Sequence, residues 1–167
     1  MLPEPLHPAV VHFPLVFALL LPILAAIAIW RIHDGAPVRT WGTVVLLAAL
    51  AFGSGFVASR TGGAEEERVE GVLASEEPLH EHEEAAELFL LVSGVTAGLA
   101  ILGFAPGLIG RSARLLALLG ALGAAGAVGR TGFLGGELVY RHGAAAAYTA
   151  GASGAADSAA AGEREDP

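Results

Sequence analysis

Long apolar stretches are the feature that most constrains the fold of this chain. An α-helix rises about 1.5 Å per residue, so about 20 consecutive apolar residues cross the hydrocarbon core of a bilayer. Stretches of about this length occur at residues 8–30, 41–59, 82–104 and 113–140. The sequence therefore predicts an all-α fold, a four-helix transmembrane bundle over residues 1–143, with the lipid bilayer as its solvent.

The remaining segments are polar or poor in large apolar side chains. Residues 60–81 form an acidic connection, for which we expect a solvated loop or a short surface helix. Residues 144–167 are mostly alanine, glycine and serine before a charged end, and we expect this tail to be disordered because it cannot build a core. No basic segment precedes the first apolar stretch, so we interpret that stretch as a retained helix and not as a cleaved signal peptide.

The composition excludes several classes of function. Hydrophobic residues make up 54% of the chain and charged residues only 16%, a balance that indicates a membrane protein. The absence of cysteine rules out disulfides, thiolate zinc sites, cysteine-ligated iron–sulfur clusters and covalently attached haem. The net charge of −8 argues against nucleic-acid binding. There is no serine-nucleophile arrangement or zinc-protease motif, so the sequence predicts no catalytic residue and does not indicate an enzyme.

Arginines in the short connections predict the orientation. Arg31 and Arg39 lie between the first two apolar stretches, and Arg111 and Arg114 lie near the start of the fourth. Short loops rich in arginine face the cytoplasm, whereas acidic residues count little in this rule. We therefore expect a multi-pass protein of a bacterial inner membrane, with the acidic connection and both termini on the outer, periplasmic side.

This topology brings several polar residues to one outer layer. The starts of the first and third helices and the end of the fourth lie at the same face, whichever way the bundle is inserted. The residues that share this layer are His7, His12, His80, His82 and His142, with Glu84, Glu87, Arg130 and Glu137. Polar side chains in a membrane helix are costly, so this layer is the candidate functional site.

Helical spacing sorts some of these side chains. His82 is in line with the small residues of the third helix and is expected to face the bundle, whereas His80 is expected at the rim. We expect His12, close to the outer end of the first helix, to face His82. Glu87 and Arg130 fall at a similar depth and are expected to form an ion pair.

The two ends of the apolar region carry recognisable motifs. His7-Pro8 through His12-Phe13-Pro14 is similar to H-P-x-x-V-H-F-P, the opening motif of the bacterial membrane proteins called the "domain of unknown function 2231" family. Residues 131–143, Thr131 to Gly143, resemble that family's closing motif G-H-x-G-G-x-L-V-Y-x-H-G, except that Phe133 stands where a histidine is expected. Related domains occur beside cytochrome c modules, so the resemblance implies a redox setting. It implies no specific activity.

The outer layer supports a cofactor or metal hypothesis. A haem b could be held by His12 and His82 from facing helices, with His142 as a further ligand. A transition metal ion could be held by imidazoles and carboxylates drawn from a larger set, namely His7, His12, His80, His82, Glu84, Glu137 and His142. Two facing histidines without a third favour haem, and a third imidazole or a carboxylate within bonding reach favours a metal ion.

Two other interpretations of the outer layer remain open. It could be a hydrogen-bonded network that fixes the bundle, in a non-catalytic accessory subunit of a larger respiratory or photosynthetic membrane complex. It could also dock a basic periplasmic electron carrier, steered by the acidic connection. Glycine at every third position from Gly120 to Gly135, and the Gly94–Gly98 pair, favour close helix packing and predict contact with a second copy or another subunit.

Overall fold

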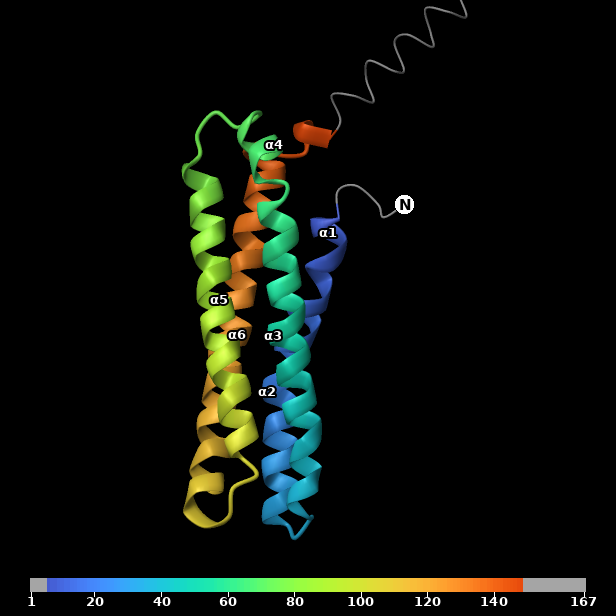
Figure 1. Ribbon diagram of the computed structural model, residues 1–167, viewed down its shortest axis with the longest axis vertical. Coiled ribbons are helices and arrows are strands. Elements are labelled where there is room, and N and C mark those ends of the chain that lie inside the picture. The colour runs from blue at the N-terminus through green and yellow to red at the C-terminus, as the bar shows by residue number, and fades with distance from the viewer. Residues whose placement is uncertain (1–5, 149–167) are drawn as a thin grey trace, which may run out of the picture.

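A computed structural model describes residues 6–148. Every regular element in this part of the chain is helical, and four helical stretches are long and apolar enough to cross a membrane (Figure 1). This finding confirms the predicted all-α, four-span bundle. The helices are α1 (His7–Val10), α2 (His12–His33), the 3-10 helix η1 (Val38–Trp41), α3 (Gly42–Gly63), α4 (Glu66–Glu70), α5 (Glu77–Leu102) and α6 (Gly107–Tyr140).

The four long helices form a closed ring. Helix α2 packs on α3 and α6, and α5 packs on the same two helices, so α3 and α6 lie diagonally opposite each other. Figure 1 shows α1, α4 and the last described residues at one end of the ring. We call this the His end, because it carries His7 and His82. The opposite end, the Arg end, carries Arg31, Arg39, Arg111 and Arg114.

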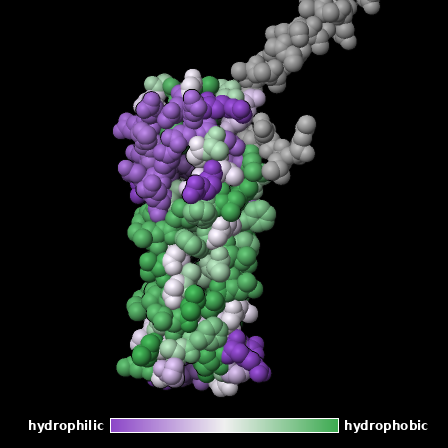
Figure 2. Space-filling view, viewed as in Figure 1, coloured by the Kyte–Doolittle hydropathy of each residue, from purple (hydrophilic) through white to green (hydrophobic). Residues whose placement is uncertain are grey.

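Small side chains fill the middle of the ring and large ones cover its outside. Trp41 is the largest fully buried residue, and the core around it is built mainly from alanines of all four long helices. Its indole Nε1 donates a hydrogen bond to the Ala100 carbonyl at 2.8 Å. Large apolar side chains such as Leu91 and Leu119 are exposed, and Figure 2 shows a broad apolar band along the middle of the visible face. In a bilayer this band faces lipid, so close backbone packing, not exclusion of water, holds the helices together.

Several helix boundaries differ from those expected. The first helix is interrupted by a turn at Val11, which separates α1 from α2. Helix α5 begins at Glu77, five residues before the expected start, because Pro78 fits the first helical turn and needs no hydrogen-bonded N–H there. Helix α6 begins after Pro106, whose extended backbone ends the preceding turn. Residues 60–81 are therefore largely helical, made of the end of α3, α4 and the start of α5.

The His end is closed by segments that are far apart in the sequence. Leu79 and Leu138 pack with Ala144 in a small apolar cluster, to which Val69 and Leu73 also contribute. The first part of the tail expected to be disordered, residues 144–148, therefore packs on the bundle. Residues 1–5 and 149–167 lie outside the described part of the chain, and with them the rest of that expectation.

Candidate functional site

Two histidine rings meet at the His end, and they come from opposite parts of the bundle. His7 is the first residue of α1, and His82 lies in the second turn of α5. The centroids of the two imidazole rings are 6.3 Å apart, and the ring planes are nearly perpendicular, at 89°. Both side chains are partly buried. We call these two residues the His pair.

The His7 ring is fixed to the end of α3. Its Nδ1 lies 2.9 Å from the Ala58 carbonyl oxygen and 3.3 Å from the Thr61 hydroxyl. The backbone N–H of His7 donates to a carboxylate oxygen of Glu65 at 3.2 Å. Since the contacts of both ring and backbone come from residues 58–65, α3 and the turn after it set the position of His7.

The His82 ring is fixed to α6 in the same way. Its Nδ1 lies 3.0 Å from the carbonyl oxygen of Thr131. Thr131 lies within α6, which packs alongside α5, so its carbonyl accepts this hydrogen bond as a second one beside that of its own helix. The His pair therefore joins α3 to α6, the two helices that face each other across the diagonal of the ring.

The two hydrogen bonds assign the same tautomer to both rings. A carbonyl oxygen can only accept, so each Nδ1 must carry the proton and donate it. In a neutral imidazole the other nitrogen, Nε2, then keeps its lone pair. Among residues 6–148 neither Nε2 has a hydrogen-bond partner, and no side-chain nitrogen or oxygen is both buried and unpaired. The Nε2 atoms are thus available as ligands, and neither is fully buried.

A glycine lies against each ring. A Cβ atom built on Gly62 of α3 would lie 3.1 Å from Cε1 of His7, and one built on Gly135 of α6 would lie 3.1 Å from Cε1 of His82. Both distances are shorter than an ordinary van der Waals contact, so any larger residue would displace the ring. The two glycines give the His pair its space.

The structure does not bring His12 to His82, so the expectation that these two residues face each other is corrected. His12 follows the turn at Val11, and its side chain is exposed on the outer surface of α2. His7 occupies the position beside His82 that was expected for His12. The turn at Val11 explains the difference, because α1 can pack on α3 with its own orientation while α2 continues along the ring.

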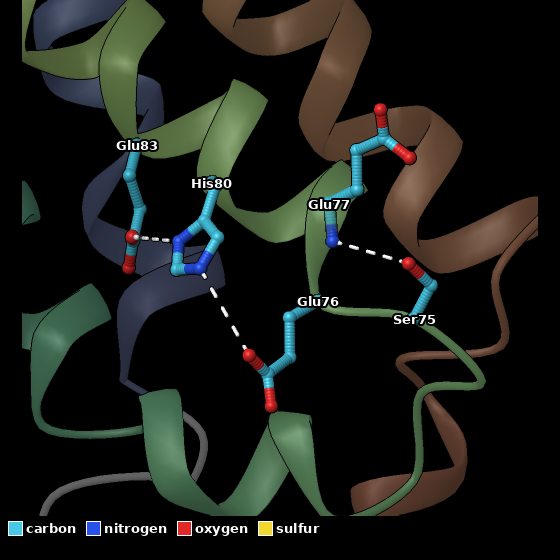
Figure 3. A network of polar contacts seen from close by, with 5 residues as sticks. All are labelled: Ser75, Glu76, Glu77, His80 and Glu83. Carbon is cyan, nitrogen blue, oxygen red and sulfur yellow. Dashed lines mark hydrogen bonds and ion pairs between the residues drawn. The ribbon is translucent and has the colours of Figure 1, made fainter.

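The other expected ligands lie apart from the His pair. His80 is exposed, with its Nδ1 at 3.5 Å from Glu83 and its Nε2 at 4.0 Å from Glu76, as Figure 3 shows. Glu84 and His142 are exposed, and Glu137 pairs with Arg141, the residue that follows α6. Among residues 6–148 no three histidine, aspartate or glutamate side chains form a group that could hold a metal ion.

The expected ion pair between Glu87 and Arg130 is absent from the described part of the chain. Both side chains are exposed, and neither is within ion-pair distance of an opposite charge. The two residues lie at a similar depth, as expected, but on different helices whose contact does not bring these side chains together.

Two cavities open at the His end, and neither is lined by the His pair. The larger, of about 650 Å³, lies between the segment after α4 and the start of α5 and is lined by glutamates together with His80. The smaller, of about 220 Å³, lies between α5 and the end of α6 and includes Glu137 and His142. Neither cavity is a slot that would seat a haem against the His pair.

The family of the chain follows from a sequence match that includes the whole described region. Residues 3–148 match the family described as "Predicted membrane protein (DUF2231)". The chain belongs to the DUF2231 family. This confirms the resemblance based on the opening and closing motifs. No curated protein and no solved structure matches the chain.

The structure shows what the motifs of this DUF2231 protein do. His7, the first histidine of the opening motif, supplies one ring of the His pair, and Gly135 of the closing motif makes room for the other. Phe133, which stands where a histidine was expected, is 65% exposed on the outer face of α6. Its side chain is directed away from His82, so this departure from the motif does not remove a neighbour of the His pair.

Sequence reasoning missed the residues that support the pair. Glu65 was part of an acidic run, and nothing in that run distinguishes it from Glu66 or Glu67. Thr131 contributes its carbonyl, which any residue would supply. Gly135 belonged to a regular row of glycines, and only the position of His82 shows which member of the row faces a ring.

Proposed function

We propose that this DUF2231 protein binds a transition metal ion between Nε2 of His7 and Nε2 of His82. The observation that supports the proposal is that both rings donate through Nδ1 to a backbone carbonyl, while neither Nε2 atom has a hydrogen-bond partner within residues 6–148. Metal-binding histidines commonly have this arrangement, because a hydrogen bond at one nitrogen orients the ring and raises the basicity of the other.

The separation of the rings suits a shared ion. Bonds from zinc to histidine nitrogen are about 2.0–2.1 Å, which places the centroids of two imidazoles sharing one ion about 5 to 6.5 Å apart. The observed separation is 6.3 Å. An ion needs far less room than a porphyrin, and neither cavity at the His end is lined by the His pair. We therefore favour a metal ion over the haem b that the presence of only two histidines would otherwise suggest.

Two imidazoles leave coordination positions open on the ion. Imidazole suits zinc, copper, iron and nickel, and of these copper and iron change oxidation state readily. We infer an electron-transfer setting, in which the open positions accept an exchangeable ligand. The support for an electron-transfer setting is that related domains of the family occur beside cytochrome c modules.

We infer that the His end faces the periplasm of a bacterial inner membrane. The support is the position of Arg31, Arg39, Arg111 and Arg114 at the opposite end of the bundle. Alkaline phosphatase fused to the C-terminus of the full chain is expected to be active, and a cytoplasmic reporter fused at the same place is expected to be inactive. The reverse result would place the His pair on the cytoplasmic side.

The metal proposal is tested by titrating the purified, full-length protein in lipid nanodiscs with copper, iron and zinc salts. Wild type is expected to bind one ion per chain. His7→Ala and His82→Ala are each expected to weaken binding at least about 100-fold, because even the outer partners of a metal ligand are worth about 10- to 100-fold. His12→Ala and His80→Ala are the matched controls, since both side chains are exposed histidines of the same end.

Two results would contradict the proposal. Equal binding by all four variants would show that any bound metal lies elsewhere. A Soret band in protein purified from its native membrane, lost in His7→Ala or His82→Ala, would replace the metal ion by haem.

A second candidate function is that of an accessory subunit, and the outer face of α6 favours it. A Cβ atom at Gly126 or Gly129 would meet nothing within 4 Å, so this part of the glycine row is open on the surface of the ring. Gly126→Leu is therefore expected to leave the single chain intact but to reduce the size of a complex with a second copy or another subunit. Size measurements on protein extracted from its native membrane in mild detergent would test this.

An accessory subunit could also dock an electron carrier at its His end. Glutamates of α4 and of the first turns of α5 lie at the His end, which carries the larger of the hydrophilic areas in Figure 2. We propose that a basic periplasmic electron carrier approaches this end, in which case its association rate falls steeply with salt. A rate independent of ionic strength would contradict this.

A further inference from the structure

One carboxylate at the His end joins three separate parts of the chain. Oε1 of Glu65 accepts hydrogen bonds from the backbone N–H groups of Leu6, at 2.9 Å, and His7, at 3.2 Å. Oε2 of the same residue accepts a hydrogen bond from the hydroxyl of Tyr148 at 2.7 Å. The turn after α3 thereby holds both the start of α1 and the segment that follows α6.

The segment that ends in Tyr148 covers the His end. After α6, Gly143 adopts a positive φ of 75°, which turns the chain back over the bundle. Ala144 is then buried against Leu79 and Leu138. The Arg68 guanidinium lies 5.6 Å from the centroid of the Tyr148 ring, so the ring is held between Arg68 and Glu65. The segment thus has one apolar and one polar attachment.

The Tyr148 phenol, which makes the polar attachment, keeps its proton into alkaline solution. Burial, and then the hydrogen bond to Glu65 and its negative charge, raise the pKa of Tyr148 to about 12. The phenol therefore remains a hydrogen-bond donor at any physiological pH. Loss of the phenol proton therefore does not break the contact at physiological pH.

We propose that Glu65 is a positioning residue for His7, and that its contact with Tyr148 is a latch that closes residues 144–148 over the His pair. While the latch is closed, Glu65 holds the His7 backbone in place and the covering segment limits access to the two Nε2 atoms. When it opens, the segment lifts and His7 is free to move away from His82. The latch would regulate metal binding by the His pair, and this regulatory role rests on the proposed function.

The latch can be tested without any metal. Diethyl pyrocarbonate acylates neutral imidazole nitrogens, and mass spectrometry of the full-length protein in nanodiscs gives a rate for each histidine. Tyr148→Phe is expected to raise the acylation rate of His7 about fivefold, the population change that loss of one ordinary hydrogen bond brings. Glu65→Ala removes all three contacts and is expected to raise the rate further. The rate at His80, already exposed, is expected to stay the same.

Matched controls exist for both variants. Tyr140 is the other tyrosine of the chain and is 89% exposed, so Tyr140→Phe is expected to have no effect on His7. Glu67 is an exposed neighbour of Glu65, and Glu67→Ala is likewise expected to have none. An unchanged His7 rate in Tyr148→Phe overturns the latch. An increase that Tyr140→Phe reproduces overturns it as well.

A second measurement follows the covering segment itself. The chain has no cysteine, so Ala144→Cys introduces a single thiol at a buried position. Its reaction with a maleimide is expected to be slow and to accelerate when Tyr148→Phe is added, whereas a thiol at the exposed position Ala146 reacts at one rate in both backgrounds. Equal rates at position 144 with and without Tyr148→Phe overturn the proposal. Because neither measurement uses metal, the latch can fail while metal binding holds, and the reverse.

Discussion

The two ends of the bundle use the same device to join helices, with different chemical consequences. At the Arg end the indole of Trp41 donates its ring N–H to the Ala100 carbonyl across to α5. At the His end the imidazoles of His7 and His82 donate theirs to the carbonyls of Ala58 and Thr131. In each case a ring N–H donates to a backbone carbonyl of a neighbouring helix.

The difference lies in what remains after that hydrogen bond is made. Indole has one nitrogen, a donor only, so Trp41 has no polar atom left and serves packing alone. Imidazole has a second nitrogen, which keeps its lone pair when the first donates. The same contact with a backbone carbonyl therefore leaves no free polar atom on tryptophan but leaves a possible metal ligand on histidine. This difference can be tested by changing each end separately.

The largest expected effect is on stability at the Arg end. Trp41 is fully buried, so Trp41→Ala is expected to lower the free energy of unfolding by about 3–5 kcal/mol through the cavity that it leaves. Metal binding at the His end is expected to be unchanged in protein that remains folded. Trp30→Ala is the control, because Trp30 is 65% exposed. Denaturant unfolding in detergent measures both, and similar losses for the two variants would contradict the assigned role of Trp41.

The next effect separates ring position from stability at the His end. In Gly62→Ala and Gly135→Ala the new methyl group would lie 3.1 Å from a ring carbon of His7 or His82, so the ring must shift. We expect metal affinity to fall about tenfold, while stability does not fall, since alanine favours a helix over glycine by about 1 kcal/mol.

Adjacent glycines provide the controls for this prediction. A Cβ atom at Gly63 or Gly136 would meet nothing within 4 Å, so alanine at either position is expected to leave metal affinity unchanged. Calorimetric titration gives the affinities. Equal effects at Gly62 and Gly63, or at Gly135 and Gly136, would show that the rings do not depend on the space beside them.

A smaller effect should appear only in alkaline solution and only at the His end. The pKa of Tyr148 is raised to about 12 in the folded chain, whereas a free tyrosine has a pKa of about 10. The Tyr148 contact therefore contributes its full stability below about pH 10 and loses it as the pH rises from about 10 to about 12. In a titration of phenolate absorbance, the step near pH 12 should persist in Tyr140→Phe and vanish in Tyr148→Phe. Its persistence in Tyr148→Phe would contradict the assignment.

The smallest effect is expected at His12. This side chain is exposed on α2 and makes no contact with the His pair, so His12→Ala should change stability by less than about 0.5 kcal/mol. Thermal unfolding measures this, with His7→Ala as the contrasting variant. A destabilisation equal to that of His7→Ala would mean that the two histidines are equivalent and would remove the distinction between them.

The sequence was sufficient for the fold because bilayer thickness sets the length of each span. The starts of the first and third spans must also lie on the same side of the membrane. This places His7 and His82 at one end of the bundle without any information on helix packing. What the sequence could not provide is the direction of each side chain around its helix. Lipid and bundle core are both apolar, so the first span, α1 with α2, shows no polar face that would tell whether His12 or His7 faces inward.

The glycine row shows the same limit in finer detail. Its regular spacing predicted close packing, but the members of the row have different surroundings. The Thr96 hydroxyl packs against Gly120 and the His82 ring packs against Gly135, while the space beside Gly126 and Gly129 is empty. Similarly, Glu87 and Arg130 were placed at a similar depth by counting residues, whereas their directions around the helices depend on how α5 and α6 pack. Only the three-dimensional arrangement provides that information.

The anchoring of the His pair makes it sensitive to the vertical alignment of the helices. His7 takes its ring position from α3 and His82 takes its own from α6, which lie diagonally opposite. If one of these helices shifted along the bundle axis by a single residue relative to the other, the rings would be displaced by about 1.5 Å. That displacement is comparable to a metal–nitrogen bond, so thinning or stretching of the surrounding bilayer would be felt as a change in the strength of binding. The metal affinity of the His pair would therefore depend on the thickness of the bilayer around the bundle.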